Sequence, residues 1–462
     1  MSRVALLLAL FLPLAVVADI TLPPAERIEL DNGTVIVLNE KHDVPLIGVQ
    51  AVLRGGAAAD PEGKAGLASL FGALLEKGAG ERSAAEFAEA IESVGGRLSA
   101  GARLETITIS GDFLARDRDL MIELLADMLQ RPALARAELD KLRERSINLI
   151  RAAKDSDPNN LMLTYAHAFL FGEHPYATPV GGEEASLASI THRDVQRYYA
   201  EQVGGDRLII AVSGSFDADE MRARLTETFG DWRAATGVLP DKAAPAAQSD
   251  TRVLLIDKPG ATQTYFWIGN VGVAIDYGAR AALDVANTVF GGSFTSMLNN
   301  ALRIESGLTY GARSRLVRPS LPGSVGISSY TATESSVEAI DMALGLLDEL
   351  HANGLTAERL DGARNYILGQ YPTTLETATQ LAAEFAELEF YGLPRDYIDG
   401  YADALAGVTP EIAATVISDV YPRRDSLVFV LLGDADAIRD DVQKYGPVTE
   451  MSITEPRFSP SE

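Results

Sequence analysis

The chain has 462 residues, of which 47% are hydrophobic and 23% are charged, a composition typical of soluble globular proteins. This length corresponds to roughly two to four domains, which excludes a single small module. Because 40 Lys and Arg stand against 65 Asp and Glu, the formal net charge is −25, and such a surface repels the phosphate backbone of nucleic acids. With no cysteine, the chain cannot form disulfides, thiolate zinc sites or iron–sulfur clusters, and it has no cysteine nucleophile.

The N-terminus has the three-part pattern of a secretory signal peptide. Arg3 precedes an apolar run over 4–17, and Val16-Val17-Ala18 forms the cleavage-site pattern before Asp19. The run contains Pro13 and is shorter than the roughly 20 residues that a membrane-spanning helix needs, although an uncleaved anchor is the alternative. We therefore expect 1–18 to be removed as a signal peptide, the mature chain to have no stable membrane span, and its location to be periplasmic or secreted.

The first half of the mature chain alternates strand and helix patterns. Apolar or alternating runs predict strands over 27–38, on either side of a turn at 31–33, and over 46–53, 106–109 and 207–213. Apolar residues at helical spacing predict helices over 64–75, 83–94, 117–129 and 136–153, and a further helix after Thr191. Ser83 and Glu86 have the spacing of a capping box, which places the start of the second helix.

The pattern begins again after an irregular stretch. Residues 233–250 contain six alanines and two prolines without helical periodicity, which is typical of a linker. Beyond it, strands are predicted over 253–257, 264–271 and 325–330, and helices over 279–289, 337–351 and 357–370. The sequence around Ala137-Glu138 recurs around Ala357-Glu358, an offset of 220 residues. We interpret this as an internal duplication of an α+β unit, the alternative being two unrelated domains of similar length.

The five histidines form no local metal motif. No two of them have the i, i+3 or i, i+4 spacing that places two imidazoles on one helix face. A long-range cluster of His167 and His174 with a carboxylate is the metal arrangement that stays open. The sequence also has no Gly-x-Ser-x-Gly elbow, no Walker A string and no Gly-x-Gly-x-x-Gly after a strand, which argues against a serine hydrolase and against nucleotide binding. The histidines are His42, His167, His174, His192 and His351.

The densest group of polar residues lies over 291–311. Small residues open it, a helix is predicted next, Gly307 is expected to end that helix, and Thr309-Tyr310 is expected to begin a strand. Arg303 then lies in the last helical turn, and the chain reversal can bring Tyr310 beside it. A permanent cation next to a phenol can hold a peptide carbonyl or stabilise an oxyanion. The alternative is structural, with the arginine complementing the helix dipole and the tyrosine in the core.

This segment resembles the C-terminal half of the pitrilysin/insulinase family of inverted-zincin metallopeptidases, in the bacterial and mitochondrial-processing-peptidase-like branch. The resemblance covers nearly the whole mature chain and implies an α+β fold. Two homologous lobes, each of duplicated α/β sandwich type with mostly antiparallel sheets flanked by helices, would face each other across a cleft. Further similar segments are 60–68, 95–100, 174–176, 181–182 and 355–358.

The sequence patterns and the resemblance together predict the domain limits. They are a signal peptide over 1–18, an N-terminal lobe with a degenerate zinc motif over 19–232, and a linker over 233–250. A C-terminal lobe that carries Arg303 and Tyr310 follows over 251–447, and a C-terminal tail over 448–462.

The sequence departs from the family where the zinc motif belongs. The family has His-x-x-Glu-His directly after Gly-Leu-Ala, but here Ser69, Gly72 and Ala73 stand at the places of the two histidines and the glutamate. The third ligand, a glutamate in the family, falls at or beside Ile150. The resemblance therefore implies a chain that binds no metal or other cofactor of its own and retains only the Arg303 and Tyr310 half of the site.

In the heteromeric branch of the family, one subunit carries the zinc motif and the other carries the arginine and the tyrosine. The resemblance thus implies the non-zinc subunit of an exported zinc metalloendopeptidase, with zinc in a homologous partner of a heterodimer or higher heteromer. Arg303 and Tyr310 are then expected to bind the peptide and stabilise the oxyanion in the partner's site. The first alternative is a non-proteolytic scaffold or peptide-binding homologue, and the second is a standalone peptidase with an unconventional metal site.

Overall fold

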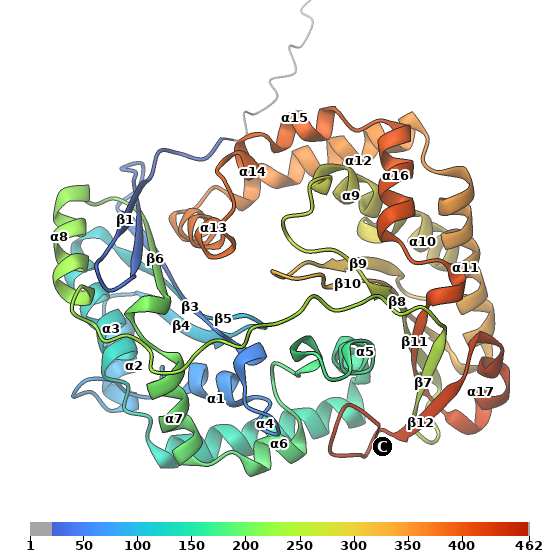
Figure 1. The fold of residues 1–462 in the computed structure, drawn as a ribbon, viewed down its shortest axis with the longest axis horizontal. Coiled ribbons are helices and arrows are strands. Elements are labelled where there is room, and N and C mark those ends of the chain that lie inside the picture. The colour runs from blue at the N-terminus through green and yellow to red at the C-terminus, as the bar shows by residue number, and fades with distance from the viewer. Residues whose placement is uncertain (1–20, 461–462) are drawn as a thin grey trace, which may run out of the picture.

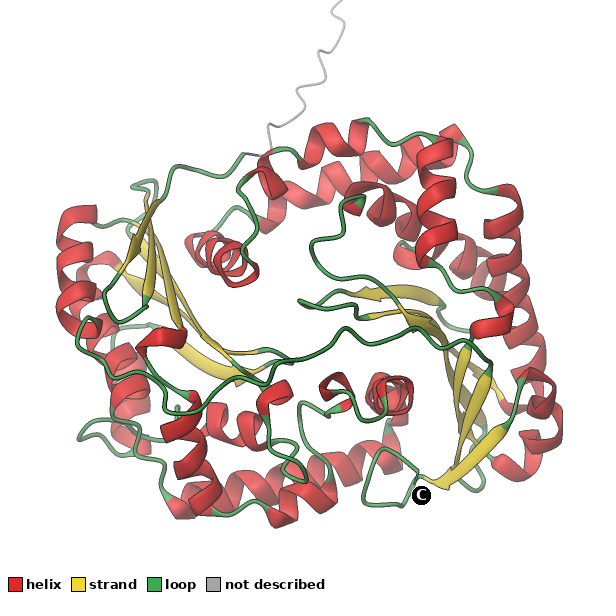
Figure 2. Ribbon diagram, viewed as in Figure 1, coloured by secondary structure: helices red, strands yellow, loops and turns green. Residues whose placement is uncertain are grey.

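In the computed structural model, which describes residues 21–460, two six-stranded sheets lie on opposite sides of the molecule (Figures 1 and 2). The first has the order β1 (Glu26–Glu29), β2 (Val35–Glu40), β6 (Leu208–Gly214), β3 (Leu46–Arg54), β5 (Thr106–Leu114) and β4 (Arg97–Ala102). The second has the order β12 (Val448–Ser452), β7 (Arg252–Asp257), β11 (Val428–Gly433), β8 (Gln263–Val271), β10 (Ser324–Ala332) and β9 (Arg313–Val317). Most neighbouring strands run antiparallel, as predicted.

The two sheets repeat one another. Strands β2, β3, β5 and β6 have counterparts β7, β8, β10 and β11 that begin 217 to 220 residues later. Each counterpart occupies the same place in its sheet, and the pairings among these four strands run in the same directions. The edge strands differ, because β1 pairs antiparallel with β2 whereas β12 pairs in parallel with β7. The predicted two-lobed α+β architecture with an internal duplication is confirmed, and residues 233–250 form no helix or strand.

Helices cover one face of each sheet and bury the larger part of the core there. The first sheet carries α1 (Leu67–Leu74), α2 (Ala84–Glu92), α3 (Arg118–Gln130), α4 (Arg136–Ser156), α6 (Glu184–Ser189), α7 (His192–Gln202) and α8 (Ala218–Phe229). The second carries α9 (Arg280–Asn287), α10 (Met297–Asn299), α11 (Ser336–Asn353), α12 (Ala357–Gln370), α15 (Tyr401–Ala406), α16 (Pro410–Val420) and α17 (Ala435–Val442). Side-chain caps fix several helix starts, and the predicted capping box of Ser83 and Glu86 is present.

Each lobe takes one helix from the other half of the chain. The helix α5 (Met162–Phe171) belongs to the first half but packs on the second sheet. The helix α13 (Ala378–Tyr391), which precedes the short α14 (Asp396–Asp399), belongs to the second half but packs on the first sheet. Both helices lie between the two sheets (Figure 1). The strands of the first sheet lie within 26–214 and those of the second within 252–452, while the two exchanged helices interlock the cores of the lobes. The limits 19–232 and 251–447 stay predictions.

The predicted C-terminal tail over 448–462 is part of the second lobe in its described portion. Val448–Ser452 forms β12, which pairs in parallel with β7 at the edge of the sheet. Phe458 is buried against the exchanged helix α5, where its ring lies 4.9 Å from that of Tyr165. The pairing with β7 and this aromatic contact hold the segment in place. Its short, polar sequence does not indicate either interaction.

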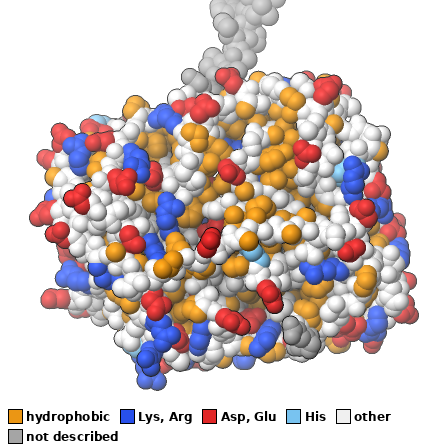
Figure 3. All heavy atoms as spheres, viewed as in Figure 1, with side chains coloured by type: hydrophobic (Ala, Val, Ile, Leu, Met, Phe, Trp, Pro, Cys, Tyr) orange, Lys and Arg blue, Asp and Glu red, His pale blue; other side chains and the backbone are white. Residues whose placement is uncertain are grey.

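The predicted signal peptide over 1–18 lies outside the described residues. Within 21–460, no helix is long and apolar enough to cross a membrane. Figure 3 shows acidic and basic side chains interspersed around the rim of one face, with hydrophobic side chains gathered toward its middle. The net negative charge is therefore spread rather than concentrated on this face.

Replacing Gly48 with alanine is expected to destabilise the protein by about 3 kcal/mol, because overpacking at a tight contact displaces backbone. An added Cβ at Gly48 on β3 would lie 2.3 Å from the backbone nitrogen of Thr379, where α13 docks. Urea unfolding followed by circular dichroism measures the change. The control is Gly345→Ala in the exposed middle of α11, where nothing lies within 4 Å and alanine favours the helix. Equal stability of the two variants would contradict tight docking of α13.

Candidate functional site

The segment that contains Arg303 is built from two π-helical turns. They are η6 (Thr288–Gly292) and η7 (Asn300–Glu305), separated by a short loop and the three-residue α10. The N–H of Ser306 donates to the carbonyl of Ala301, five residues back, and the Ser306 hydroxyl donates to the same oxygen at 2.8 Å. The predicted helix is therefore present over 297–305, with Arg303 in its last turn, but it winds mostly as a π-helix. Such wider turns are found frequently at functional sites.

A glycine is needed where this segment meets the sheet. A Cβ added to Gly291 would lie 2.2 Å from the backbone nitrogen of Ser314 on β9. The wide turn η6 can approach the edge strand only because Gly291 has no side chain. The position of the segment over β9 is thus set by the first glycine of the Gly291-Gly292 pair.

The chain reverses after η7, as predicted, at Gly307 with a φ of 69°. The next strand begins at Arg313 and not at Thr309, which corrects the prediction. The Thr309 hydroxyl accepts a hydrogen bond from the N–H of Gly311 and lies 3.0 Å from the Ser329 hydroxyl. Such local bonds hold the backbone in a turn, so Tyr310 stands on a fixed loop rather than in the sheet.

Arg303 and Tyr310 lie together, and a third residue joins them. The Cζ of Arg303 is 4.5 Å from the centre of the Tyr310 ring and 4.9 Å from that of Phe294. These two cation–π contacts are the side-chain interactions that Arg303 makes among residues 21–460. Tyr310 is 72% exposed and Phe294 62% exposed, so the group faces solvent. We call Phe294, Arg303 and Tyr310 the arginine sandwich.

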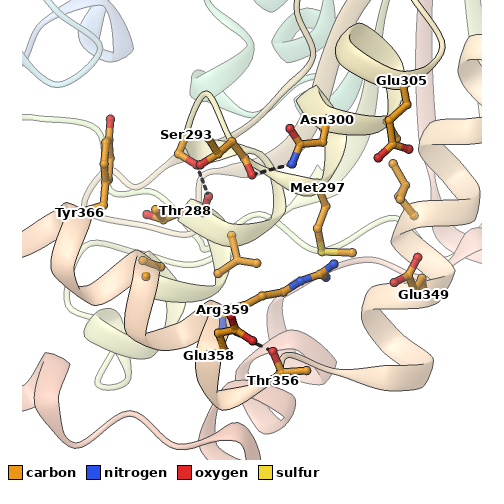
Figure 4. A pocket seen from close by; sticks show the side chains of 16 residues that line it. Thr288, Ser293, Met297, Asn300, Glu305, Glu349, Thr356, Glu358, Arg359 and Tyr366 are labelled. Atoms are coloured by element: carbon orange, nitrogen blue, oxygen red, sulfur yellow. Dashed lines mark hydrogen bonds between the residues drawn. The ribbon is translucent and has the colours of Figure 1, made fainter.

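The other side of the same segment walls a cavity of about 620 Å³ (Figure 4). Asn300 and Glu305 of η7 face this cavity, and α11 and α12 form its opposite wall with Glu349 and Arg359. The Asn300 amide donates to the carbonyl of Thr295, another residue that lines the cavity, at 3.0 Å. The arginine sandwich and the cavity therefore share η7 as their common wall.

The four positions of the degenerate zinc motif lie on two neighbouring helices. Ser69, Gly72 and Ala73 are on α1, and Ile150 is on α4, which packs beside it. A Cβ at Gly72 would lie 3.3 Å from the β4 backbone, and Ile150 packs into the apolar core. Among the described residues, no group of three or more His, Cys, Asp or Glu is arranged to hold a metal ion.

The start of α1 is fixed by Asp60. Its carboxylate accepts the N–H groups of Gly66 at 2.9 Å and Ala68 at 2.8 Å, at the N-terminus of the helix. The segment 60–68, one of those that resemble the family, therefore positions the start of α1. The Asp60 carboxylate orients α1 even though the zinc-binding residues of the family are absent from this helix.

The two histidines considered for a long-range metal site have structural roles. His167 on α5 lies with its Nε2 atom 2.9 Å from the Ser324 hydroxyl, and the His174 Nε2 atom lies 3.0 Å from the carbonyl of Ala243. Both rings pack against Phe171, at 5.4 and 6.1 Å between ring centres. In the part of the chain that the structure describes, no carboxylate completes a metal site with them.

Acidification is expected to destabilise the protein through His167. Burial lowers the pKa of His167 from 6.5 to about 4, so the unfolded chain binds more protons between these values. The free energy of unfolding should fall by roughly 3 kcal/mol from this group as the pH drops from 6.5 to 4. Glu384, whose pKa burial raises to about 7, acts in the opposite sense.

Comparison with a His167→Gln variant isolates the histidine, because Glu384 is common to both proteins. The stability difference between the two, measured by urea unfolding at each pH, should change across this window. A constant difference would show that His167 titrates normally.

Sequence comparisons identify related proteins for both halves of the chain. A family model described as "Insulinase (Peptidase family M16)" matches residues 35–184, and one described as "Peptidase M16 inactive domain" matches residues 189–367. An uncharacterized zinc protease of Mycobacterium tuberculosis is 26% identical over 78% of this chain and 82% of its own length. The non-peptidase homolog YmxG of Helicobacter pylori is 24% identical over 78% of this chain and 83% of its own length.

A third relative, the mitochondrial-processing peptidase subunit beta of Blastocladiella emersonii, is 24% identical over 53% of this chain and 52% of its own length. Two solved structures share the fold at a TM-score of 0.82, each across 89% of this chain. One is a peptidase M16 inactive domain from Pseudomonas fluorescens, 21% identical and covered over 98% of its length. The other is a protease from H. pylori, 19% identical and covered over its full length.

Proposed function

Because the chain belongs to the insulinase (M16) family of peptidases, as its motifs predicted, we propose that it is the non-zinc subunit of a heteromeric zinc metalloendopeptidase. Arg303 and Tyr310 then bind the peptide and stabilise the oxyanion in a site whose zinc belongs to a homologous partner. The observation that carries this proposal is the arginine sandwich. Its two rings are exposed, and among residues 21–460 the half-buried guanidinium makes no hydrogen bond or ion pair that would tie it into the fold.

The geometry of the arginine sandwich suits a peptide carbonyl. The Arg303 guanidinium contacts two aromatic rings and forms no ion pair among residues 21–460, so its N–H groups are free to donate. The Tyr310 hydroxyl adds a neutral donor on an exposed ring. Donors that are fixed before the reaction stabilise a developing oxyanion without having to reorganise, which is the usual source of catalytic advantage at such sites.

Zinc in the partner would activate the attacking water. The residues of this chain act on the peptide. Arg303 donates to the carbonyl oxygen of the peptide, holds it in place, and interacts more strongly as negative charge develops there. Tyr310 donates its hydroxyl proton in a hydrogen bond to the same oxygen or to the next carbonyl along the peptide.

The partner and the location are parts of the same proposal. One relative is named as a subunit of mitochondrial-processing peptidase, a name that points to a multi-chain peptidase. The pattern over 1–18 supports export, so the complex is proposed to work in the periplasm or outside the cell. The partner should then be an exported homologue with an intact His-x-x-Glu-His motif.

Expression of the chain alone, and together with such homologues, tests this function. Bound zinc and hydrolysis of a quenched fluorescent peptide are measured for each preparation. We expect both to appear only in the co-purified pair. Stoichiometric zinc or hydrolysis in the chain alone would contradict the proposal.

A non-proteolytic scaffold is the second candidate. It is favoured by the relative named as a non-peptidase homolog and by the replacement of all zinc-motif residues. A scaffold has no use for an arginine without an ion-pair partner that two exposed aromatic rings hold in place. A stable pair that contains zinc but hydrolyses no peptide would support the scaffold.

A further inference from the structure

We propose that Phe294 is a positioning residue that holds the Arg303 guanidinium in its working orientation, and that Asn299 sets the place of the Phe294 ring. This inference rests on the proposed function, because it concerns the same site. Nothing in the sequence pattern gave Phe294 a role. In the structure the centre of its ring lies 4.9 Å from the Cζ of Arg303, which also lies 4.5 Å from the centre of the Tyr310 ring.

The contact with Phe294 replaces the salt bridge that usually orients an arginine. Other arginines of the described chain, such as Arg82 and Arg439, are held by carboxylates at 2.6 to 3.0 Å. A carboxylate beside Arg303 would occupy the N–H groups that a peptide needs. An aromatic ring holds the plane through its face and leaves those groups free.

The exposure of Phe294 argues against a role in the core. With 62% of its surface exposed, its ring contributes little to the burial that stabilises the fold. Its ring contacts Arg303, and its backbone carbonyl accepts a hydrogen bond from the Asn299 side chain. Removing the ring should therefore change the site without changing the fold.

Asn299 connects the two ends of the arginine sandwich. Its side chain is buried at 5% exposure, and its Nδ2 group donates to the carbonyl of Phe294 at 2.6 Å. Its Oδ1 atom accepts the N–H of Ala312, two residues after Tyr310, at 3.4 Å. One buried amide thus spans from the loop that carries the first ring to the loop that carries the second, and fixes the distance between them.

Steady-state kinetics of the assembled complex with a quenched fluorescent peptide test the inference. Phe294→Leu keeps the apolar volume but loses the ring face, and should lower kcat/KM by about fivefold. Phe294→Tyr keeps the face and should restore the native value. The matched control is Tyr366→Leu, an aromatic residue 48% exposed at the cavity behind η7, which should leave kcat/KM unchanged.

A double-mutant cycle separates positioning from direct contact. If Phe294 acts through Arg303, Phe294→Leu has no further effect once Arg303 is alanine. An undiminished fivefold loss in that background would show that Phe294 contacts the peptide itself, and would overturn the inference. If Arg303→Ala lowers kcat/KM but Phe294→Leu does not, the proposed function stands and the positioning role fails.

A second measurement needs no partner. Both rings should shift the Arg303 side-chain proton resonances upfield in the isolated chain, and Phe294→Leu and Asn299→Ala should each reduce that shift. Thermal unfolding of Phe294→Leu should match that of the native chain. Arg303 resonances that are insensitive to Phe294→Leu would overturn the inference independently of any activity.

Discussion

Replacing Arg303 with alanine is expected to lower kcat/KM of the assembled complex by about 10³-fold. Removing one fixed donor from an oxyanion site costs about 10²- to 10³-fold, and here the donor also carries a full positive charge. The fold should be unaffected, because Arg303 makes only the two cation–π contacts of the exposed arginine sandwich among residues 21–460. Peptide hydrolysis by the co-purified complex, with thermal unfolding of each preparation, gives both quantities.

Two further variants control for charge and shape. Arg303→Lys keeps the charge but loses the planar set of donors, and should recover only part of the rate. Arg116→Ala removes one positive charge from a side chain that is 77% exposed on the first lobe, and should leave turnover unchanged. Native turnover by a well-folded Arg303→Ala complex would remove the catalytic role from this chain.

Replacing Tyr310 with phenylalanine is expected to lower kcat by about 10²-fold, because the ring is retained and only the hydroxyl donor is lost. The ring still covers Arg303 at 4.5 Å, so peptide binding through the arginine should persist and KM should change little. Tyr310→Ala removes the ring as well, and should raise KM in addition. Steady-state kinetics of the two variants separate the hydroxyl from the ring.

Because Tyr310 is exposed, changes in kcat and KM of its two variants can be separated from changes in stability. At 72% exposed, it contributes little to stability, so all three proteins should unfold at the same temperature. If Tyr310→Phe and Tyr310→Ala were equally slow and both kept the native KM, the ring would have no part in holding Arg303. The geometry of the arginine sandwich would then be incidental to catalysis.

Local signals in the sequence predicted most of the fold. The capping box at Ser83 and the cap at Thr191 act over three residues, and both are present in the structure. The apolar periods predicted the helix 357–370, which the structure shows with the same bounds as α12. The duplication was visible because the two halves keep the same spacing of elements.

The exchange of α5 and α13 could not be predicted in this way. An apolar stripe shows that a helix face is buried, but not against which sheet. That choice depends on distant contacts, such as the close approach of Thr379 to Gly48 across 331 positions of sequence. Strand β12 escaped prediction for a similar reason, because its pairing with β7 is set by the neighbouring edge rather than by its own polar sequence.

At the candidate site, the meeting of Arg303 and Tyr310 followed from a reversal at a glycine, which is a local feature. The π-helical turns could not be predicted from local features, because they depend on the hydrogen bonds of Ser306 and on the close approach of Gly291 to β9. The role of Phe294 could not be predicted either, since a single aromatic residue between Ser293 and Thr295 belongs to no periodic pattern. Its contact with Arg303 closes a nine-residue separation that only the folded chain reveals.

Photo-crosslinking from position 310 tests most directly whether this chain contacts the substrate in a partner's site. A complex with p-benzoylphenylalanine in place of Tyr310 is irradiated with a labelled peptide, after zinc has been removed with a chelator so that the peptide stays intact. The same probe at Ile412, 43% exposed on α16, is the control. We predict a covalent adduct between the peptide and this chain from position 310 and none from 412. Absence of the adduct from 310, in a complex that hydrolyses the peptide when zinc is present, would contradict the proposed function.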